Sequence, residues 1–340
     1  RDLLLLGGGH SHIQVLKRLA MSPVPGIRVS VVSREVLSPY SGMLPGHVAG
    51  FYDRESMHFD LPQLANAAGA RFIHDEVIGL DPEGHSVQLA RHPQMRYDLV
   101  SLNLGGAPRG VSQHVTPVKP IGSFLPQWHA ARAAITAGDR VIVVGGGAGG
   151  SELALAMRTA LPEGATITVV CTELLPGFTP GTQNLMRRAL SDRGIELIDG
   201  FRVASATGQS VTSVDGEDLP AEHIFWVTGV SAPPLLRETG LRVDEHGFVM
   251  VNDQLQSISH PNVFAAGDVA CLQGQQRPKS GVFAVREGPV LADNLIRFLL
   301  QKSLRAYRAQ ENFLVLIGTG NRRAIASRGD FAIEGRWVWW

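Results

Sequence analysis

The sequence predicts an α/β fold with two Rossmann-like domains, the second inserted in the first, and a small strand-rich appendage at the C-terminus. Two glycine-rich turns, at residues 7–12 and 145–150, each follow an apolar strand and precede a helix. Far downstream, residues 263–268 (Val-Phe-Ala-Ala-Gly-Asp) return the chain to the first domain. The N-terminus of a helix offers unpaired N–H groups and a partial positive charge, which suit a pyrophosphate. Two such turns therefore predict two dinucleotide-binding domains, with electrons passing between the dinucleotides.

The first domain starts as a βαβ unit and then carries a small antiparallel insertion. Its expected elements are a strand at 3–6, a helix at 11–20, a strand at 27–32, short strands at 71–73, 77–80 and 86–89, and a returning strand within 97–104. Residues 108–126 are rich in proline and glycine, so we expect them to form a linker.

The second domain repeats the βαβ pattern, and the chain then re-enters the first domain. The expected elements are a strand at 141–144, helix 150–160, a strand ending at 170, helix 183–193, strand 225–229, the return at 262–270 and helix 281–300. We expect the first domain to comprise residues 1–112 and 246–305, the second residues 113–245, and the appendage residues 306–340. The chain starts at Arg and ends in Trp-Val-Trp-Trp, which leads us to expect that both ends are cut from a longer chain.

Composition narrows the class of protein. Of the 340 residues 44% are apolar, enough for more than one core, and 31 basic residues balance 31 acidic ones. A basic stripe is absent from the sequence, which argues against a nucleic-acid partner, and apolar runs such as 313–317 are too short to span a membrane. Two cysteines build neither a disulfide framework nor a metal site, which fits a reducing compartment. We expect a cytoplasmic protein with at most peripheral membrane contact.

The order of motifs resembles the two-dinucleotide-binding flavoprotein superfamily, which includes the pyridine nucleotide-disulfide oxidoreductases. The motifs are the Gly-Gly-Gly turn at 7–9, Leu-Gly-Gly at 104–106, Gly-Gly-Gly-Ala-Gly-Gly-x-Glu at 145–152, Trp-Val-Thr-Gly-Val at 226–230 and Ala-Ala-Gly-Asp at 265–268. Together they span nearly the whole chain. Residues 39–46 and 278–288 are most similar to the type II NADH dehydrogenase-like branch, and more narrowly to the flavoprotein module fused to selenophosphate synthetase.

The resemblance implies FAD at the first turn and NADH or NADPH at the second. Asp268 matches the family aspartate whose carboxylate accepts hydrogen bonds in the ribityl or phosphate region of the flavin. The cofactor-binding residues expected on this basis are Gly7, Gly9, His10, Ser11, Glu35, Gly105, Gly145, Gly147, Gly150, Glu173, Gly229, Gly267, Asp268, Gly281 and Val282.

Three positions depart from the family pattern. His12 stands where the first turn would carry its third glycine, which puts the local packing in question. Ser33 and Cys171 end the two strands that usually carry an acidic residue for the ribose hydroxyls, and Glu35 and Glu173 follow two residues later as substitutes. The absence of an arginine directly after Cys171 favours NADH slightly over NADPH, although the next helix carries two arginines.

Two residues are the candidate catalytic groups. Negative charge develops at flavin N1 and the C2 oxygen, where the helix that starts near Gly281 would aim its N–H groups and Lys279 would reinforce them. Glu152 matches the glutamate that reaches toward the nicotinamide carboxamide, for positioning or proton relay. The alternative for Lys279 is a solvated lysine in a loop, and the alternative for Glu152 is a charge that only stabilises the N-terminus of its helix. His10 and His12 do not face each other on a helix, so no metal site is expected.

Residues 39–46 replace the segment in which disulfide reductases carry a Cys-x4-Cys pair. We therefore expect an FAD-dependent NAD(P)H oxidoreductase that passes electrons directly to a quinone-like or chalcogen-containing acceptor. Two alternatives stay open: a redox or interaction module for selenophosphate synthetase, with a role in selenium metabolism, and a sulfide:quinone reductase-like enzyme, which the cysteine count disfavours. Cys271 either approaches the flavin or is a small buried residue, and Tyr40 and Met43 either line the flavin edge or belong to a core.

Overall fold

The contacts of the chain divide it into two units, each built from three stretches of sequence. The computed structural model describes residues 1–108, 110, 112, 114–275, 279–310 and 313–339. Unit 1 comprises Arg1–Tyr40, His58–Ala107 and Val230–Ala309, and unit 2 comprises Ser41–Met57, Pro108–Gly229 and Gln310–Trp340. Compared with the expected domain limits, residues 41–57, 108, 110 and 112 fall in unit 2, and residues 230–245 and 306–309 fall in unit 1. Residues 113 and 340, at which expected domains start or end, lie outside the described residues.

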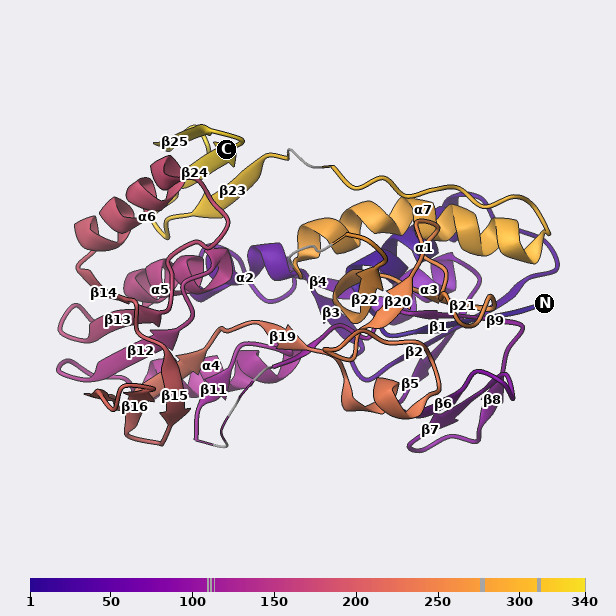
Figure 1. Ribbon diagram of the computed structural model, residues 1–340, viewed down its shortest axis with the longest axis horizontal. Coiled ribbons are helices and arrows are strands. Elements are labelled where there is room, and N and C mark those ends of the chain that lie inside the picture. The colour runs from indigo at the N-terminus through magenta and orange to yellow at the C-terminus, as the bar shows by residue number, and fades with distance from the viewer. Residues whose placement is uncertain (109, 111, 113, 276–278, 311–312, 340) are drawn as a thin grey trace. The chain divides into compact units, whose positions relative to one another are not determined.

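Unit 1 is built on a parallel sheet with the strand order β21-β9-β1-β2-β5 (Figure 1). The strands are β1 (Asp2–Leu6), β2 (Arg28–Ser33), β5 (Arg71–His74), β9 (Leu99–Leu102) and β21 (Val263–Ala265). The helices that pack against it are α1 (His10–Met21), α3 (Leu61–Ala67) and α7 (Gly281–Leu299). The apolar side chains of β1 are buried, as expected for a parallel strand covered on both faces.

The expected antiparallel insertion forms, but it is smaller than predicted. It consists of β6 (Val77–Asp81), β7 (Ser86–Leu89) and β8 (Met95–Arg96). The prediction that 71–73 belongs to it was wrong, because β5 pairs in parallel with β2, from Ser30 opposite Arg71 to Ser33 opposite His74. In a strand of four residues, the pattern of apolar and polar side chains does not distinguish the edge strand of a parallel sheet from a strand of a hairpin. Short elements complete the unit: β3 (Leu37–Pro39), β4 (His58–Asp60), η2 (Pro234–Glu238), β20 (Val249–Val251), η3 (Gly267–Val269) and β22 (Ala270–Leu272).

Unit 2 repeats the architecture with a parallel sheet of order β11-β18-β12-β13-β14. The strands are β11 (Thr116–Pro117), β12 (Arg140–Val144), β13 (Thr166–Cys171), β14 (Ile195–Asp199) and β18 (His223–Trp226). Its helices are α2 (Leu44–Val48), α4 (Ile121–Ala134), α5 (Ala148–Ala160) and α6 (Pro180–Asp192), and β15 (Val203–Ala206), β16 (Ser210–Ser213) and β17 (Asp218–Pro220) form a small antiparallel sheet. In both units the strand before the glycine-rich turn is central.

Helix α4 contradicts the expectation that residues 108–126 form a linker. The helix starts at Ile121 and carries Pro126 inside it, at the cost of one backbone hydrogen bond. Phe124, Leu125 and Trp128 are all buried in the core of unit 2. Burial of two large aromatic side chains outweighs that cost, which the proline and glycine content of the sequence does not reveal.

The strand-rich C-terminal region forms as expected and packs on unit 2. It contains β23 (Val315–Gly318), β24 (Ala324–Arg328) and β25 (Phe331–Gly335), and lies beside α5 and α6 (Figure 1). Ile317 and Ile325 are fully buried in the same core as α5, and the Ser327 hydroxyl lies 2.9 Å from that of Thr182. The region therefore shares the core of unit 2.

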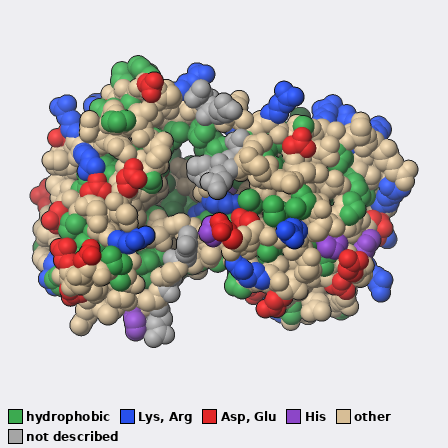
Figure 2. All heavy atoms as spheres, in the orientation of Figure 1, with side chains coloured by type: hydrophobic (Ala, Val, Ile, Leu, Met, Phe, Trp, Pro, Cys, Tyr) green, Lys and Arg blue, Asp and Glu red, His purple; other side chains and the backbone are tan. Residues whose placement is uncertain are grey.

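The distribution of charged side chains on the surface and the hydropathy of the helices agree with the amino-acid composition. On the face shown in Figure 2, basic and acidic side chains are interspersed over both units. Among the described residues, no helix is long and apolar enough to cross a membrane.

We expect the carboxylate of Asp75 to stabilise the insertion of unit 1 in a pH-dependent way. Burial alone would raise the pKa of Asp75, but hydrogen bonds from the His92 ring and from the backbone N–H groups of Glu76, Arg91 and His92 hold it well below its ordinary value. A depressed carboxyl pKa stabilises the folded state above the ordinary pKa, and this contribution is lost as pH falls below it. Asp75→Ala should lower the melting temperature by several degrees at neutral pH and by less below about pH 4.

The control for Asp75→Ala is Glu76→Gln, which removes the neighbouring charge from an exposed ion pair with Arg34. Its melting temperature should match that of the wild type. Equal melting temperatures of Asp75→Ala and wild type at pH 7 would contradict the assignment.

Candidate active site

The first glycine-rich turn connects β1 to α1 in unit 1. Gly7 adopts a φ of +97°, a left-handed conformation that favours glycine, and its N–H donates to the carbonyl oxygen of Val32 at 2.8 Å. A Cβ atom on Gly7 would lie 2.3 Å from the Asn103 carbonyl oxygen, so the turn packs against the chain that leaves β9. Helix α1 has no side-chain cap at Gly9 and no acidic residue in its first turn. No acidic side chain of α1 therefore opposes an anion at this end of the helix.

Asn103 holds this turn in place, although no motif in the sequence marks it. Its Oδ1 atom accepts hydrogen bonds from the N–H groups of Ser11 and His12 at 3.1 and 3.3 Å, and its Nδ2 atom donates to the Ala266 carbonyl oxygen at 2.6 Å. A Cβ on Gly9 would lie 2.3 Å from Asn103 Oδ1, so Gly9 is needed to admit this amide. One buried side chain thus joins the first turn to the ends of β9 and β21.

His12 takes the place of the third glycine by bonding the turn rather than by leaving space. It is fully buried, with Nδ1 2.7 Å from the Gly7 carbonyl oxygen and Nε2 2.8 Å from the Ser101 hydroxyl. Burial lowers the pKa of His12 to about 4, so the ring is neutral at physiological pH. Among the described residues, no group of three His, Cys, Asp or Glu side chains could hold a metal ion.

The remaining residues predicted near the first turn have different surroundings. The Ser11 hydroxyl donates to the Ala284 carbonyl oxygen at 2.7 Å, so it ties α1 to α7. His10 packs edge-on against Tyr40, with ring centroids 5.2 Å apart. Glu35 follows the end of β2, and burial raises its pKa. Gly105 has a φ of +74° and open space where a Cβ would stand.

A second cluster in unit 1 surrounds η3 and the start of α7. Gly267 has a φ of +72°, and its N–H donates to the carboxylate of buried Glu287 at 2.6 Å, a contact that the sequence analysis did not find. Asp268 follows directly in η3. Helix α7 starts at Gly281 and Val282 with no side-chain cap and no acidic residue in its first turn, which fits the expected electrostatic role of this N-terminus.

Lys279 belongs to this cluster and is not a solvated loop lysine. Its Nζ atom donates to the Ala270 carbonyl oxygen and lies 3.9 Å from the centroid of the Phe248 ring. Burial lowers the pKa of Lys279, and the surrounding Cys271 and acidic side chains act in the opposite direction. The neighbouring Cys271 is half-buried, and burial together with its hydrogen bond to Asp244 raises its pKa. Pro278, the first residue of the motif at 278–288, lies outside the described residues.

The second glycine-rich turn connects β12 to α5 in unit 2. Gly145 has a φ of +128°, and a Cβ on Gly150 would lie 1.9 Å from the Gly145 carbonyl oxygen, so the helix packs directly on the turn. Gly147 and Gly149 have no atom within 4 Å of the position that a Cβ would take. Helix α5 has no side-chain cap and no acidic residue in its first turn. This N-terminus is therefore open to an anion.

Glu152 lies one turn further along α5, beside a cavity of about 190 Å³. Its Oε1 atom accepts a hydrogen bond from the Gly318 N–H of β23 at 2.6 Å, and burial raises the pKa of Glu152 to about 7. The cavity is lined by glycines and by mainly apolar side chains, among them Met43, Pro45, Ala49, Phe51, Tyr52, Leu316, Val338 and Trp339. A carboxyl group that titrates near pH 7 in such a place is suited to proton transfer.

The predicted residues are divided between the two units. Gly7, Gly9, Gly267 and Lys279 belong to unit 1, whereas Glu152 belongs to unit 2. Gly229 follows β18 at the end of a stretch of unit 2 and has open space around it, and exposed Glu173 follows β13.

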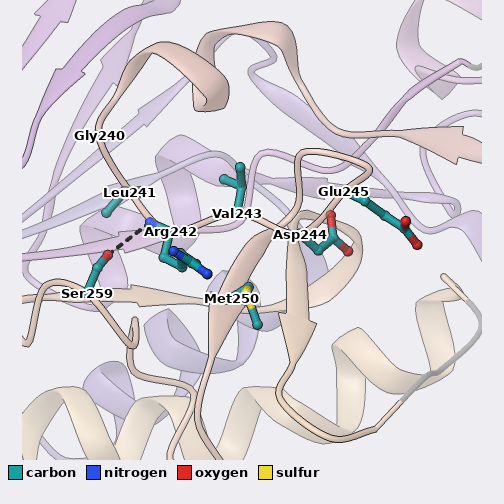
Figure 3. Close-up of a pocket in the computed structure, with 8 residues that line it drawn as sticks. All are labelled: Gly240, Leu241, Arg242, Val243, Asp244, Glu245, Met250 and Ser259. Carbon is teal, nitrogen blue, oxygen red and sulfur yellow. Dashed lines mark hydrogen bonds between the residues drawn. The ribbon is translucent and has the colours of Figure 1, made fainter.

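A wide hollow of about 670 Å³ lies elsewhere in unit 1 and holds none of the predicted site residues. Figure 3 shows its lining of Gly240, Leu241, Arg242, Val243, Asp244, Glu245, Met250 and Ser259, with the Arg242 N–H bonded to the Ser259 hydroxyl at 3.0 Å. It lacks a glycine-rich turn at the N-terminus of a helix, so it is not the dinucleotide site.

In both parallel sheets four strands follow the same order, β9-β1-β2-β5 in unit 1 and β18-β12-β13-β14 in unit 2. Each sheet has a glycine-rich turn after its central strand, and together they define a two-dinucleotide-binding α/β fold. The model of the pyridine nucleotide-disulphide oxidoreductase family matches residues 1–288, and the chain belongs to this family. Binding of FAD and NAD(P)H is typical of the family. Family membership and fold make the chain an oxidoreductase.

Three comparisons place the chain among its relatives. A probable ferredoxin reductase of Castellaniella defragrans is 27% identical over 79% of this chain and 68% of its own length. An NADH dehydrogenase-like protein of Mycobacterium tuberculosis is 27% identical over 82% of this chain and 75% of its own length. The crystal structure of the sulfide:quinone oxidoreductase of Aquifex aeolicus superimposes with a TM-score of 0.84, covering 99% of this chain and 88% of that one at 15% identity, which shows a shared fold.

We expect replacement of Asn103 to disrupt the first turn. Asn103→Leu keeps the approximate volume but leaves two N–H groups and the Ala266 carbonyl without their buried partner. The free energy of unfolding should fall by about 2–4 kcal/mol. The measurement is denaturant unfolding.

The control is Asn66→Leu in the last turn of α3, where the amide is exposed. It should leave the unfolding midpoint within experimental error of the wild type. If Asn103→Leu unfolds at the same midpoint as Asn66→Leu, then the amide is not what holds the turn.

Proposed function

We propose that this chain is an FAD-dependent NAD(P)H oxidoreductase. In this proposal FAD binds at the first turn and the nicotinamide nucleotide at the second. When bound, FAD would supply the chemistry that takes up hydride from the nicotinamide, and the electrons would leave to an acceptor outside the chain without a redox disulfide.

The observation that carries the proposal is the open N-terminus of α5. Two other helices of the chain, α3 and α6, satisfy N-terminal N–H groups with the side chains of Asp60 and Thr179, whereas α5 has no such cap. The space above Gly147 and Gly149 is clear, so a pyrophosphate can approach the backbone. The partial positive charge of a helix end then faces the ligand.

The residues of unit 1 also fit a flavin dinucleotide. The Asn103 amide fixes the first turn, and Glu287 fixes Gly267 directly before Asp268. In the proposed complex the N-terminus of α1 faces the pyrophosphate, Asp268 accepts hydroxyl groups, and the N-terminus of α7 stabilises negative charge together with Lys279. Glu35 is positioned two residues after β2 to accept ribose hydroxyls.

The route by which electrons leave is inferred from the segment that replaces a redox disulfide. Residues of 41–57 line the cavity beside Glu152, and both cysteines of the chain are free thiols. An apolar cavity with one protonatable carboxyl group fits a small ring-shaped acceptor, such as a quinone, which takes up protons with its electrons. In the proposed reaction Glu152 delivers a proton to that acceptor, which extends the expected role at the nicotinamide carboxamide.

A protein acceptor is the second candidate. The relative from Castellaniella defragrans is named as a probable ferredoxin reductase, which favours a small electron-carrier protein as an alternative acceptor. A role beside selenophosphate synthetase, or with a chalcogen-containing acceptor, rests on the sequence resemblance at 39–46 and 278–288 alone.

The second turn is tested by Gly147→Val. The branched side chain enters open space, so the fold should tolerate it, but it blocks approach of the pyrophosphate to the backbone. With the flavin-loaded protein under anaerobic conditions, the NADH concentration needed for half-maximal flavin reduction should rise at least about tenfold, a loss of about 1.4 kcal/mol. Stopped-flow absorbance at the flavin band measures it.

Gly181→Val is the matched control, because it places the same side chain in the first turn of α6, which Thr179 caps. Its reduction should match that of the wild type. Reduction of Gly147→Val at the wild-type rate and concentration would show that the nucleotide binds elsewhere.

The proton-transfer role of Glu152 predicts a specific pH dependence. A carboxyl group with a pKa of about 7 is protonated below that pH, so the rate of quinone reduction should fall as pH rises through about 7. Glu152→Gln should be several-fold slower at pH 6 and should lose this titration, while its flavin content stays unchanged. An unchanged pH profile in Glu152→Gln would exclude this role.

A further inference from the structure

The ends of β13 and β14 form a polar cluster at the edge of the sheet where the second turn lies. Cys171 and Asp199 are the last residues of these neighbouring strands and stand opposite each other in the parallel register. In a dinucleotide-binding unit the ribose that adjoins the adenine lies over the end of the second strand. In this chain that strand is β13, and it ends in a thiol rather than a carboxylate.

The thiol of Cys171 is a neutral donor to Asp199. Cys171 is buried, and burial together with the nearby Asp199 carboxylate raises the pKa of its thiol to about 12. Its Sγ atom lies 3.7 Å from Asp199 Oδ1, which also accepts the Gly200 N–H at 3.2 Å. Cys171 therefore cannot accept the two ribose hydroxyls as an aspartate or glutamate would.

Asp199 also pairs with an arginine of the neighbouring helix α6. Arg187 of α6 forms a salt bridge through Nη2 to Asp199 Oδ2. The Asp199 side chain is 26% exposed and that of Arg187 44%, so both are within reach of a ligand. A guanidinium group held by a carboxylate has lost part of its attraction for a phosphate.

Glu173 supplies the hydroxyl acceptor that Cys171 lacks. The adjacent Leu174 and Leu175 are fully buried, and the Leu175 N–H donates to the Gly146 carbonyl oxygen at 2.7 Å, so the loop is anchored to the second turn. Glu173 is exposed, with Oε1 3.4 Å from Gln183 Nε2.

We propose that Asp199, through its pairing with Arg187, makes the second turn select NADH over NADPH. The charged side chains that act on the Cys171 thiol are Glu173 and Asp199, which are negative, and Arg187, which is positive, so these three together carry one net negative charge. That charge repels the 2′-phosphate of NADPH, whereas Glu173 accepts the 2′- and 3′-hydroxyls of NADH. Asp199 is thus a specificity-determining residue that acts through Arg187. The inference rests on the proposed binding of a nicotinamide nucleotide at the second turn.

The test compares binding of ADP-ribose with binding of 2′-phospho-ADP-ribose by calorimetry on the flavin-loaded protein. Wild type should bind ADP-ribose more tightly. Asp199→Asn keeps an oxygen for the Cys171 thiol but releases Arg187, so the affinity ratio should shift about tenfold toward the phosphorylated ligand. In Asp199→Asn combined with Arg187→Ala, that gain should disappear, which a merely structural effect of Asp199 would not produce.

Asp192→Asn is the matched control, since Asp192 forms an exposed ion pair with Arg188 on the same helix. It should leave the affinity ratio as in the wild type. Preference of the wild type for 2′-phospho-ADP-ribose, or an unchanged ratio in Asp199→Asn, would overturn the selectivity inference alone. Failure of either ligand to bind, with Gly147→Val no different, would instead overturn the proposed nucleotide site.

Discussion

The Asn103 amide is the interaction on which the geometry of unit 1 depends. Its three hydrogen bonds reach the first turn of α1 and the end of β21, segments that lie more than a hundred residues apart in the sequence. Because the groups are buried, the loss of one bond would leave a donor or acceptor without a partner. That desolvation penalty exceeds the net free energy that the bond itself contributes. Gly9 and Gly267 are glycines partly because the amide occupies the space a Cβ would need. The position of an FAD pyrophosphate in the proposed function would follow from this one side chain.

The two glycine-rich turns solve the same steric problem by different means. In unit 2, Gly150 has no Cβ and so packs against the Gly145 carbonyl. In unit 1, His12 bonds the corresponding Gly7 carbonyl through Nδ1 and uses Nε2 for Ser101 of β9. Burial keeps the ring neutral, so it offers one N–H and one acceptor without placing a charge in the core. A departure from the motif therefore preserves the contact between helix and turn.

Sequence periodicity and turn chemistry were enough to predict both parallel sheets, because a buried apolar strand followed by a glycine-rich turn has few alternative structures. They did not predict α4, because its proline and glycine residues indicated a linker. The buried side chains of Phe124, Leu125 and Trp128 were therefore not recognised as core residues. Nor did they distinguish β5 from a hairpin strand, because β5 pairs with β2, which lies far from it in the sequence, and local patterns do not reveal such pairing. For the candidate site, the glycines were identified from the sequence, while Asn103, Glu287 and Asp199 were missed. Each of these three acts through partners distant in the chain, and a single polar residue carries no signal of its own.

Because residues 41–57 and 310–340 belong to unit 2, the stretches of the two units alternate along the chain. The polypeptide passes from one unit to the other after residues 40, 57, 107, 229 and 309, so neither unit is a continuous piece of chain. A cut at any one of these points removes part of at least one unit, and after a cut behind residue 57, 107 or 229 neither fragment contains a complete unit. The two halves therefore cannot be exchanged between relatives as cassettes, and each core can close only after the chain has visited the other.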